Sequence, residues 1–238
     1  MSKNIKMNFN SENKLILKNV TLIAVSSVKI EATIKALEHS MNLVDFAEVK
    51  LVTHLDIKHD SIKIEKCEEI TSIKDYSEYM VYSLHKHIDT DYALTVQHDG
   101  FVVNADSWLD DFYDYDYIGA PWPNNFFMDE NSIMIQDRDN GGKSIRVGNG
   151  GFSFRSQKLL NIFNELNIPW EAKENCWHED GFICMTHLKT LRDNGIKFPD
   201  ARLAYKFSRE VECEDLDNTR EPFGFHNYRD KNTNYPKF

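Results

Sequence analysis

The stretch Ala93-Leu94-Thr95-Val96-Gln97-His98-Asp99-Gly100 decides the fold, because an apolar run ends abruptly there in polar residues and a glycine. A run of this length that follows a helical pattern predicts a buried strand. In open α/β sheets, ligands bind outside the carboxyl ends of the strands. We therefore expect the Asp99 carboxylate at the mouth of a crevice, where it could meet a hard cation or a sugar hydroxyl. Taken alone, the stretch is explained better by a simple turn, since Asp and Gly favour turns.

The residues before this strand predict the start of a parallel sheet. Residues 20–25 form a near-continuous apolar run, which is typical of a strand buried on both faces. Residues 28–41 carry apolar side chains at three-to-four spacing, which predicts an amphipathic helix, and residues 49–53 predict a second strand. A strand, a helix and a strand in this order indicate a parallel pair with a right-handed crossover. A short strand over 61–64 and a helix over 72–88 follow.

The second half of the chain is less regular. Strand character returns over 148–154, and helices are predicted over 156–166, capped by Ser156, and over 177–194. Residues 124–146 are polar without periodicity, which is typical of a mobile binding loop. The tail from residue 201 onward is predicted to be irregular.

Length and composition fit one domain. The chain has 238 residues, of which 41% are hydrophobic, so it can build a large core. We find no internal repeat and no linker. We predict an α/β fold with a mostly parallel central sheet flanked by helices. This domain spans residues 19–238 and follows a loosely ordered segment over 1–18.

Charge, apolar runs and cysteine spacing argue against a nucleic-acid-binding, membrane-spanning or disulfide-linked protein. The net charge is -10 and no basic stretch is visible, which argues against a nucleic-acid partner. The longest apolar run is too short to span a bilayer, and no signal peptide is evident. Four cysteines lack C-x-x-C spacing, so we expect reduced thiols in a cytoplasmic protein. These are Cys67, Cys176, Cys184 and Cys213.

Three glycines in four positions, Gly148, Gly150 and Gly151, form a second cluster. Glycine lets the backbone approach a ligand closely and take a positive φ. A tight hairpin entry explains the same glycines equally well, because glycine commonly marks turns.

Two further clusters contain titratable side chains. Glu179 and Asp180 open a predicted helix, where they could serve as dipole partners, or one could be a general base whose pKa the other raises. His226 lies between aromatic residues and could be a packed core residue. As a ligand, it would bind a metal together with Asp99. One carboxylate and one imidazole, completed by phosphate oxygens and water, suit Mn²⁺ or Mg²⁺.

The order of these motifs resembles a known family. The motifs are QHDG (97–100), DYIGAPW (116–122), GNGGFSFR (148–155), ED (179–180) and FGFH (223–226). In this order they resemble a bacterial and viral family of uncharacterised glycosyltransferases. More distantly they resemble the GT-A class of nucleotide-sugar glycosyltransferases, which has a Rossmann-like fold. The likeness runs over residues 20–228.

The resemblance implies a metal site. GT-A enzymes hold a divalent metal on a D-x-D motif at a strand end, and residues 97–99 occupy that place. Gln97 replaces the first aspartate, so Asp99 is the implied ligand and strict metal dependence stays open. His226 matches the histidine that often completes the site, with Mn²⁺ or Mg²⁺ as the cofactor.

The resemblance also implies a nucleotide-sugar site. The first strand end would lie beside the base and ribose, two tyrosines of the following helix would line the same pocket, and the Gly-Gly element would lie under the donor sugar. Trp122 is a candidate stacking surface for a sugar ring, although a buried core indole is as good an interpretation. The implied residues are Val25, Ser26, Ser27, Tyr76, Tyr79, Gln97, His98, Gly150, Gly151 and Trp122.

The implied reaction is transfer of a sugar from a nucleotide sugar, with a UDP-sugar favoured, to a glycan or another hydroxyl acceptor. It is of the hexosyltransferase kind. Glu179 and Asp180 match the position of the base in inverting enzymes, and we favour Asp180. The replacement at Gln97 leaves an alternative open, namely a non-catalytic nucleotide- or carbohydrate-binding module with a degenerate metal site. A metal-dependent hydrolase of diphosphate compounds is a more distant alternative.

Overall fold

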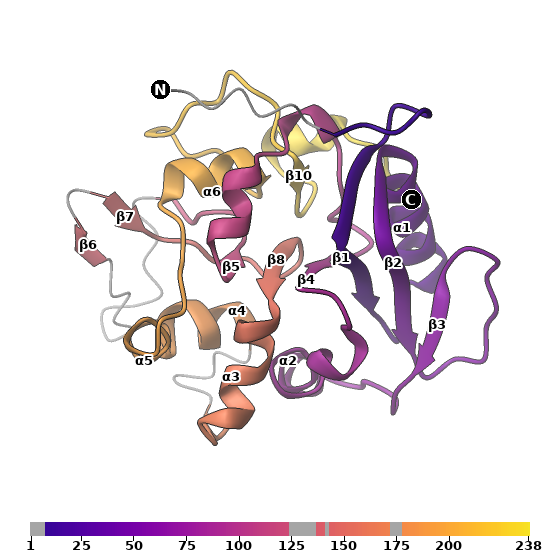
Figure 1. The fold of residues 1–238 in the computed structure, drawn as a ribbon, viewed down its shortest axis with the longest axis horizontal. Coiled ribbons are helices and arrows are strands. Elements are labelled where there is room, and N and C mark those ends of the chain that lie inside the picture. The colour runs from indigo at the N-terminus through magenta and orange to yellow at the C-terminus, as the bar shows by residue number, and fades with distance from the viewer. Residues whose placement is uncertain (1–7, 124–136, 141–142, 172–177) are drawn as a thin grey trace.

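The computed structural model describes residues 8–123, 137–140, 143–171 and 178–238. Its centre is a six-stranded sheet of order β3-β2-β1-β4-β8-β5 (Figure 1). The strands are β1 (Leu15–Val25), β2 (Val44–Thr53), β3 (Lys63–Lys66), β4 (Tyr92–Thr95), β5 (Tyr117–Ile118) and β8 (Ser153–Ser156). The first four in the order are parallel, and β8 is antiparallel to both of its neighbours. The predicted class, a single α/β domain with a mostly parallel sheet flanked by helices, is confirmed.

The first strand starts earlier than predicted. β1 begins at Leu15 instead of residue 20, because Leu15 and Leu17 are buried and pair with Val44 and Phe46 of β2. Residues 15–18 therefore lie in the sheet, although loose order was expected there. The division of the chain at residue 19 stays a prediction.

Helices cover both faces of the sheet, as strand alternation requires. Leu22 of β1 belongs to the same buried cluster as Leu37 of α1, whereas the next residue, Ile23, packs in another cluster with Met80 of α2 and Leu160 of α3. The helices are α1 (Ile30–Leu43), α2 (Ile73–Tyr82), α3 (Gln157–Glu165), α4 (Glu179–Gly181), α5 (Leu188–Asp193) and α6 (Ala201–Phe207). The predicted cap of α3 is confirmed, since the Ser156 side chain accepts a hydrogen bond from the Leu159 N–H.

Two predicted helices are interrupted. The helix expected over 72–88 ends at Tyr82 and continues as a 3-10 turn over Leu84–His87. The helix expected over 177–194 is described from residue 178 and consists of α4, a π-helical turn over Phe182–Thr186, and α5. In the π-helical turn the His187 N–H donates to the Phe182 carbonyl, five residues earlier. Such turns often occur at functional sites.

The prediction of an irregular C-terminal tail is wrong. It contains α6, which Asp200 caps by accepting from the Leu203 N–H, and which buries Ala204 and Phe207. It also contains β9 (Ser208–Arg209), which pairs in parallel with β10 (Gly224–Phe225).

The remaining predictions concern the region between β5 and β8. The predicted strand over 148–154 is shorter, because β8 begins only at Ser153. Of the predicted mobile loop, residues 137–140 and 143–145 form the antiparallel pair β6 (Asp137–Asn140) and β7 (Lys143–Ile145). Residues 124–136 and 141–142 lie outside the described residues.

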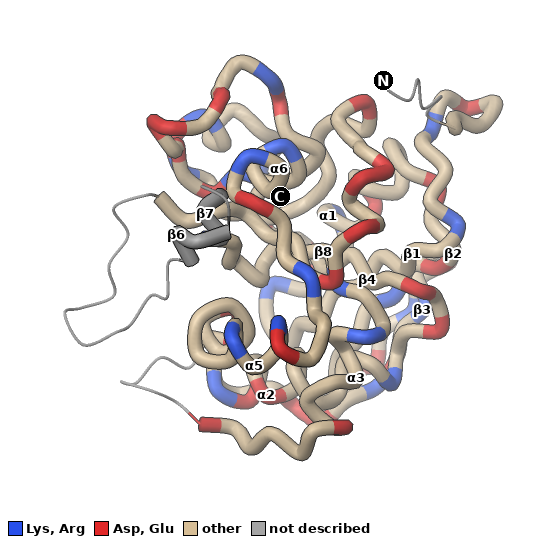
Figure 2. Tube along the Cα trace, turned by 60° about the vertical axis from the view of Figure 1, so that its left-hand side comes forward, with Lys and Arg blue, Asp and Glu red and all other residues tan. Residues whose placement is uncertain are grey.

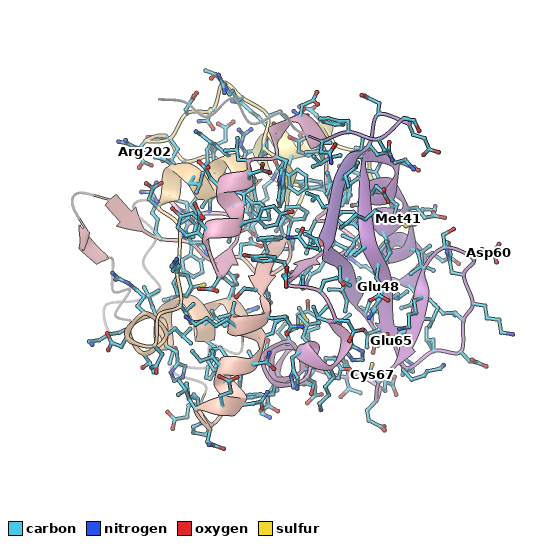
Figure 3. The ribbon with its side chains drawn as sticks, in the orientation of Figure 1. Met41, Glu48, Asp60, Glu65, Cys67 and Arg202 are labelled. Atoms are coloured by element: carbon cyan, nitrogen blue, oxygen red, sulfur yellow. The ribbon has the colours of Figure 1, made fainter. Side chains whose placement is uncertain are left out.

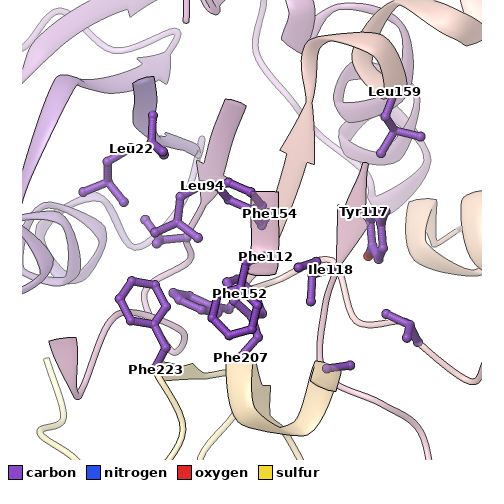
Figure 4. Packing of buried hydrophobic residues seen from close by; sticks show 14 of the residues in the cluster. Leu22, Leu94, Phe112, Tyr117, Ile118, Phe152, Phe154, Leu159, Phe207 and Phe223 are labelled. Carbon is purple, nitrogen blue, oxygen red and sulfur yellow. The ribbon is translucent and has the colours of Figure 1, made fainter. Parts of the chain in front are cut away.

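An aromatic cluster fills the core next to β4 and β8. Phe154 of β8 lies beside Phe152, which directly precedes this strand, and beside Phe112, Phe207 and Phe223, which come from three other segments (Figure 4). Each buried phenylalanine contributes about 1.5–3 kcal/mol relative to an exposed one. The cluster therefore ties α6 and the segment before β10 to the sheet.

A charged side chain of β2 is buried in the sheet. Lys50 of β2 is 1% exposed, and its Nζ lies 2.7 Å from a Glu48 carboxylate oxygen and 3.5 Å from one of Glu65. Figure 3 shows the two glutamates on the side of the molecule formed by β2 and β3. The Lys50 ammonium also donates to the His87 carbonyl at 2.7 Å. Compensation from these partners explains how a lysine fits into an apolar strand pattern.

Charges of both signs are interspersed along the described trace (Figure 2). Within the described ranges, no helix combines the length and the apolar character needed to cross a bilayer.

Candidate functional site

Two adjoining hollows open beside the carboxyl ends of β1 and β4. The larger has a volume of about 580 Å³ and the smaller about 330 Å³, and they share Ile73, Tyr76 and Gln97. The larger is lined by the predicted residues Tyr76, Gln97, Trp122, Gly150, Gly151, Glu179, Asp180 and His226. The smaller is lined by the predicted residues Val25, Ser26, Ser27, Tyr76, Gln97 and His98. Residues from distant parts of the sequence thus meet around two adjoining hollows.

Residues 97–100, directly after β4, form a tight turn. The Gln97 N–H donates to the Gly100 carbonyl at 3.0 Å, and the Gly100 N–H donates to the Gln97 carbonyl at 3.1 Å. The interpretation as a turn and the interpretation as a site therefore both hold, because the turn directs Gln97 and His98 into the cavity.

The two predicted metal ligands lie close together. Oδ1 of Asp99 is 3.7 Å from Nε2 of His226 and 3.4 Å from Nδ1 of His98. Oδ1 is buried and has no hydrogen-bond partner among the described residues. A buried carboxylate oxygen without a partner is costly, and a ligand bound beside His226 would remove this cost, although Asp99 itself lines neither hollow.

Gln97 connects both hollows to the histidine. Its side-chain N–H donates to the Tyr76 hydroxyl at 2.9 Å, and its oxygen accepts from Nε2 of His226 at 3.2 Å. Gln97 is therefore oriented with its side-chain oxygen toward His226. Burial raises the pKa of the Tyr76 hydroxyl, and the charge of Glu179 raises it further, so this hydroxyl stays protonated.

Glu210 is a site residue that the sequence analysis missed. It follows β9 directly, as His226 follows β10, and the parallel pairing of the two strands brings them to the same edge. A Glu210 oxygen lies 3.8 Å from Nδ1 of His226. Burial alone would lower the pKa of His226, but its contacts with Glu210 and the charge of Asp99 raise that pKa overall. The only sequence signal was an acidic residue in a tail predicted to be irregular.

Gly150 and Gly151 were predicted to allow a positive φ or a close approach to a ligand, but in the structure they allow close packing against two side chains. Asn149, with φ 55°, takes the left-handed conformation, whereas Gly150 and Gly151 do not have positive φ. A Cβ at Gly150 would overlap the Glu179 carboxylate, and one at Gly151 would overlap the His226 ring. The two glycines are therefore required because the loop packs directly against two side chains of the site.

Glu179 and Asp180 have different surroundings. Glu179 is buried and pairs with the equally buried Arg155, whose Nη2 lies 3.2 Å from its Oε1. Asp180 lines the cavity, and its Oδ1 accepts from the Gly181 N–H at 2.7 Å. Burial and the charge of Glu179 raise the pKa of Asp180 to about 6. Asp180 therefore fits a general base that is ionised at neutral pH, and Glu179 does not.

The smaller hollow lies where β1 ends and α1 begins. Ser27 accepts from the Ile70 N–H at 3.0 Å, which joins the first strand end to the segment that leads into α2. At the other side, Lys29 Nζ lies 2.9 Å from Nε2 of His98. Burial lowers the pKa of His98, so this imidazole is neutral at pH 7 and accepts from the lysine.

Two predicted residues do not fit their expected places. Tyr79 packs against the same buried cluster as Tyr76 but lines neither hollow, and its hydroxyl lies 2.6 Å from Nε2 of His87 instead. Trp122 lines the larger hollow, but it is only 9% exposed and its indole packs against Gly148. The interpretation of Trp122 as a core indole is therefore favoured, with one edge reaching the cavity.

Comparison with known proteins places the chain in a family. No curated protein matches it. A crystal structure of a glycosyltransferase involved in the glycosylation of the major capsid of PBCV-1 is 14% identical, with a TM-score of 0.48. The likeness covers 90% of this chain and 95% of that one, and it is too distant to assign an activity. Residues 59–226, more than half of the chain, match the family described as "Protein of unknown function (DUF5672)". The chain therefore belongs to the DUF5672 family.

Proposed function

We propose that the protein is a glycosyltransferase that moves a sugar from a nucleotide diphosphate sugar, with a UDP-sugar favoured, to a hydroxyl acceptor. One observation carries the proposal. Gln97, Asp180 and His226, which the motif order assigns to donor binding, base catalysis and metal binding, line the same cavity. The smaller hollow beside Ser26 and Ser27 adjoins this cavity and offers room for the nucleoside.

The residues around Asp99 fit a divalent metal. The Asp99 carboxylate oxygen without a partner, the imidazole of His226 and the amide oxygen of Gln97 are donors that Mn²⁺ and Mg²⁺ accept. In the described ranges, no group of three or more His, Cys, Asp or Glu residues is placed to hold a metal. The proposed site therefore relies on the diphosphate and water for its remaining ligands. When bound, the ion would neutralise the charge that develops on the leaving diphosphate.

The chain supplies the base and the orientation. In our proposal the acceptor hydroxyl lies in the larger hollow, where the Asp180 carboxylate removes its proton as the oxygen attacks the anomeric carbon. The bond from that carbon to the diphosphate oxygen breaks in the same step. Attack from the face opposite the leaving group inverts the configuration.

The proposal is tested by measuring UDP release from a panel of UDP-sugars with Mn²⁺, in the presence and absence of sugar acceptors. We expect at least one donor to be consumed faster with an acceptor than with water. Equal turnover with water would indicate a diphosphate hydrolase. No binding and no turnover with any nucleotide sugar, GDP and other nucleotides included, would contradict the proposal.

Gln97 favours a second candidate function, a nucleotide- or carbohydrate-binding module whose metal site has degenerated. The side chain at this position is a neutral amide that is already engaged by Tyr76 and His226. This function predicts ligand binding that neither a chelator nor Asp99→Ala changes, together with no turnover.

A further inference from the structure

Arg155 is a buried cation that the mechanism above does not use. It lies on β8, is fully buried and makes three contacts through its guanidinium group. Its Nε donates to the Ser153 hydroxyl at 3.0 Å, and its Nη2 donates to Glu179 at 3.2 Å. Its guanidinium also lies 5.7 Å from the centre of the Tyr117 ring. These contacts fix the guanidinium to the rigid sheet.

A pair of this kind is expensive to bury. The desolvation of two charges consumes much of their attraction, so well-packed apolar residues at these positions would stabilise the fold as well. A contribution to fold stability is therefore a poor explanation for the burial of Arg155 and Glu179 at these positions. A role in fixing the orientation of the neighbouring chain is a better one, because the planar guanidinium joins Ser153 of β8 to the Glu179 carboxylate through two of its N–H groups.

The neighbouring chain is the segment that carries Asp180. Glu179 and Asp180 are consecutive in α4, which is three residues long and leads into the π-helical turn. So short a helix has few hydrogen bonds of its own to orient its side chains. The Glu179 carboxylate is held from one side by Arg155 and from the other by the backbone at Gly150, where even a Cβ would overlap it.

We propose, on the basis of the proposed function, that Arg155 and Glu179 are positioning residues that anchor α4 to β8 and thereby direct the Asp180 carboxylate into the cavity. The role of Glu179 is then structural support for the base rather than proton transfer. Because Arg155 belongs to β8, the pair fixes Asp180 relative to the sheet and to the loop at Gly150, which in our proposal lies under the donor sugar.

The charged surroundings of Asp180 belong to this arrangement. Burial and Glu179 raise the pKa of Asp180, and the hydrogen bond from the Gly181 N–H and the nearby His178 oppose the rise. The titratable groups that interact with Asp180 are Tyr76, Tyr117, His178, Glu179, Cys184, Glu210 and His226. Arg155 is the cation that neutralises the nearest of them, Glu179.

The test combines hydrogen–deuterium exchange with kinetics on the full chain. Arg155→Lys keeps the charge but loses the planar guanidinium that joins Ser153 to Glu179, and Glu179→Gln keeps an acceptor but loses the charge. Arg146→Met is the matched control. Arg146 is also a buried arginine, and it pairs with Asp215 at 2.7 Å, away from α4.

We expect faster exchange over 178–187 in Arg155→Lys and Glu179→Gln, with exchange over 92–100 and UDP affinity unchanged. The kcat should fall by about 100-fold, as a displacement of about 1 Å at a reacting group predicts, while the donor KM stays the same. Arg146→Met should leave exchange over 178–187 unchanged.

Unchanged exchange over 178–187 in both variants would overturn the proposal. So would a kcat within a factor of about two of the wild type, which is far below the loss that misplacement of a base predicts. Hydrogen–deuterium exchange can be measured without turnover. It therefore tests whether Arg155 and Glu179 anchor α4 even if the protein proves not to be a transferase. If Arg155→Lys fails to fold, the test relies on Glu179→Gln, which is nearly isosteric with the wild type.

Discussion

At the scale of single residues, Asp180 bears most of the chemistry in our account. Its pKa is raised to about 6 by burial and by Glu179. A base works only when it is deprotonated, so activity should be full above pH 6 and lost as the pH falls below it. We expect kcat/KM to drop about tenfold per pH unit on the acid side of that value. A profile that stays flat down to pH 5 would argue against Asp180 as the base.

Substitution of the same residue separates chemistry from binding. Asp180→Asn keeps the size and the acceptor for the Gly181 N–H but cannot take a proton. We expect turnover to fall by about 10²–10⁴-fold, which is the usual contribution of a general base, with UDP affinity unchanged in calorimetry. Asp106→Asn serves as the comparison, because it makes the same change at an exposed aspartate that lines neither hollow. Retention of wild-type turnover in Asp180→Asn would refute the assignment.

The site residues that the sequence could predict are those in contiguous motifs. The structure brings together Asp99, Asp180 and His226, which motif order singled out. Glu210 could not be predicted, because its place depends on the pairing of two dipeptide strands that have no sequence pattern. Tyr79 was predicted from its helix alone, but a side chain three positions from Tyr76 points elsewhere.

At the scale of elements, the loop between β7 and β8 contacts both the proposed metal ligand and the residue that supports the proposed base. Gly151→Ala places a methyl group on the His226 ring, and Gly150→Ala places one on the Glu179 carboxylate. We expect Gly151→Ala to weaken Mn²⁺-dependent UDP binding. Gly150→Ala should instead lower kcat with UDP binding retained.

Calorimetry and initial rates on both variants check this prediction. Each glycine variant is the control for the other, since the two methyl groups are added to consecutive residues of the same loop. Equal effects of the two substitutions on binding and on kcat would contradict the separate roles.

The N-cap of α3 offers a prediction on stability alone. Ser156 accepts from the Leu159 N–H and donates to Asp116 at 2.6 Å, and it lines neither hollow. Ser156→Ala should lower the free energy of unfolding by about 1 kcal/mol, the usual value for an N-cap. UDP binding should not change. Urea denaturation measures the first quantity, and a loss of UDP affinity would show that the cap also supports the site.

Elements with a regular hydrophobic pattern were predictable, and irregular ones were not. The strand over 20–25 and the helix over 28–41 are confirmed as parts of β1 and α1, because their apolar spacing reflects burial directly. The helix over 177–194 was predicted as continuous because a π-helical turn leaves the apolar spacing nearly helical. α6 was missed because its seven residues lie between polar segments that obscure its period.

At the scale of the whole molecule, hydrogen bonds join the two segments that carry the motifs DYIGAPW and GNGGFSFR. The Trp122 N–H donates to the Arg146 carbonyl at 2.8 Å, and the Gly148 N–H donates to the Ala120 carbonyl at 3.2 Å. DYIGAPW and GNGGFSFR thus form one wall of the larger hollow, although 25 residues separate them in sequence. The fold class followed from β-α-β order, but this contact between loops depends on the antiparallel strand β8. The cytoplasmic location stays a prediction.

The central claim is that the cavity is a donor site whose metal depends on Asp99. Calorimetric titration of UDP tests it most directly, first with Mn²⁺ and then with EDTA, on the wild type and on Asp99→Ala. Asp106→Ala is the matched control, because Asp106 is an exposed aspartate, whereas Asp99 is partly buried and lies 3.7 Å from Nε2 of His226. Our account predicts UDP binding that is lost with EDTA and in Asp99→Ala but kept in Asp106→Ala. Binding of equal strength under all these conditions, or none to the wild type, would contradict it.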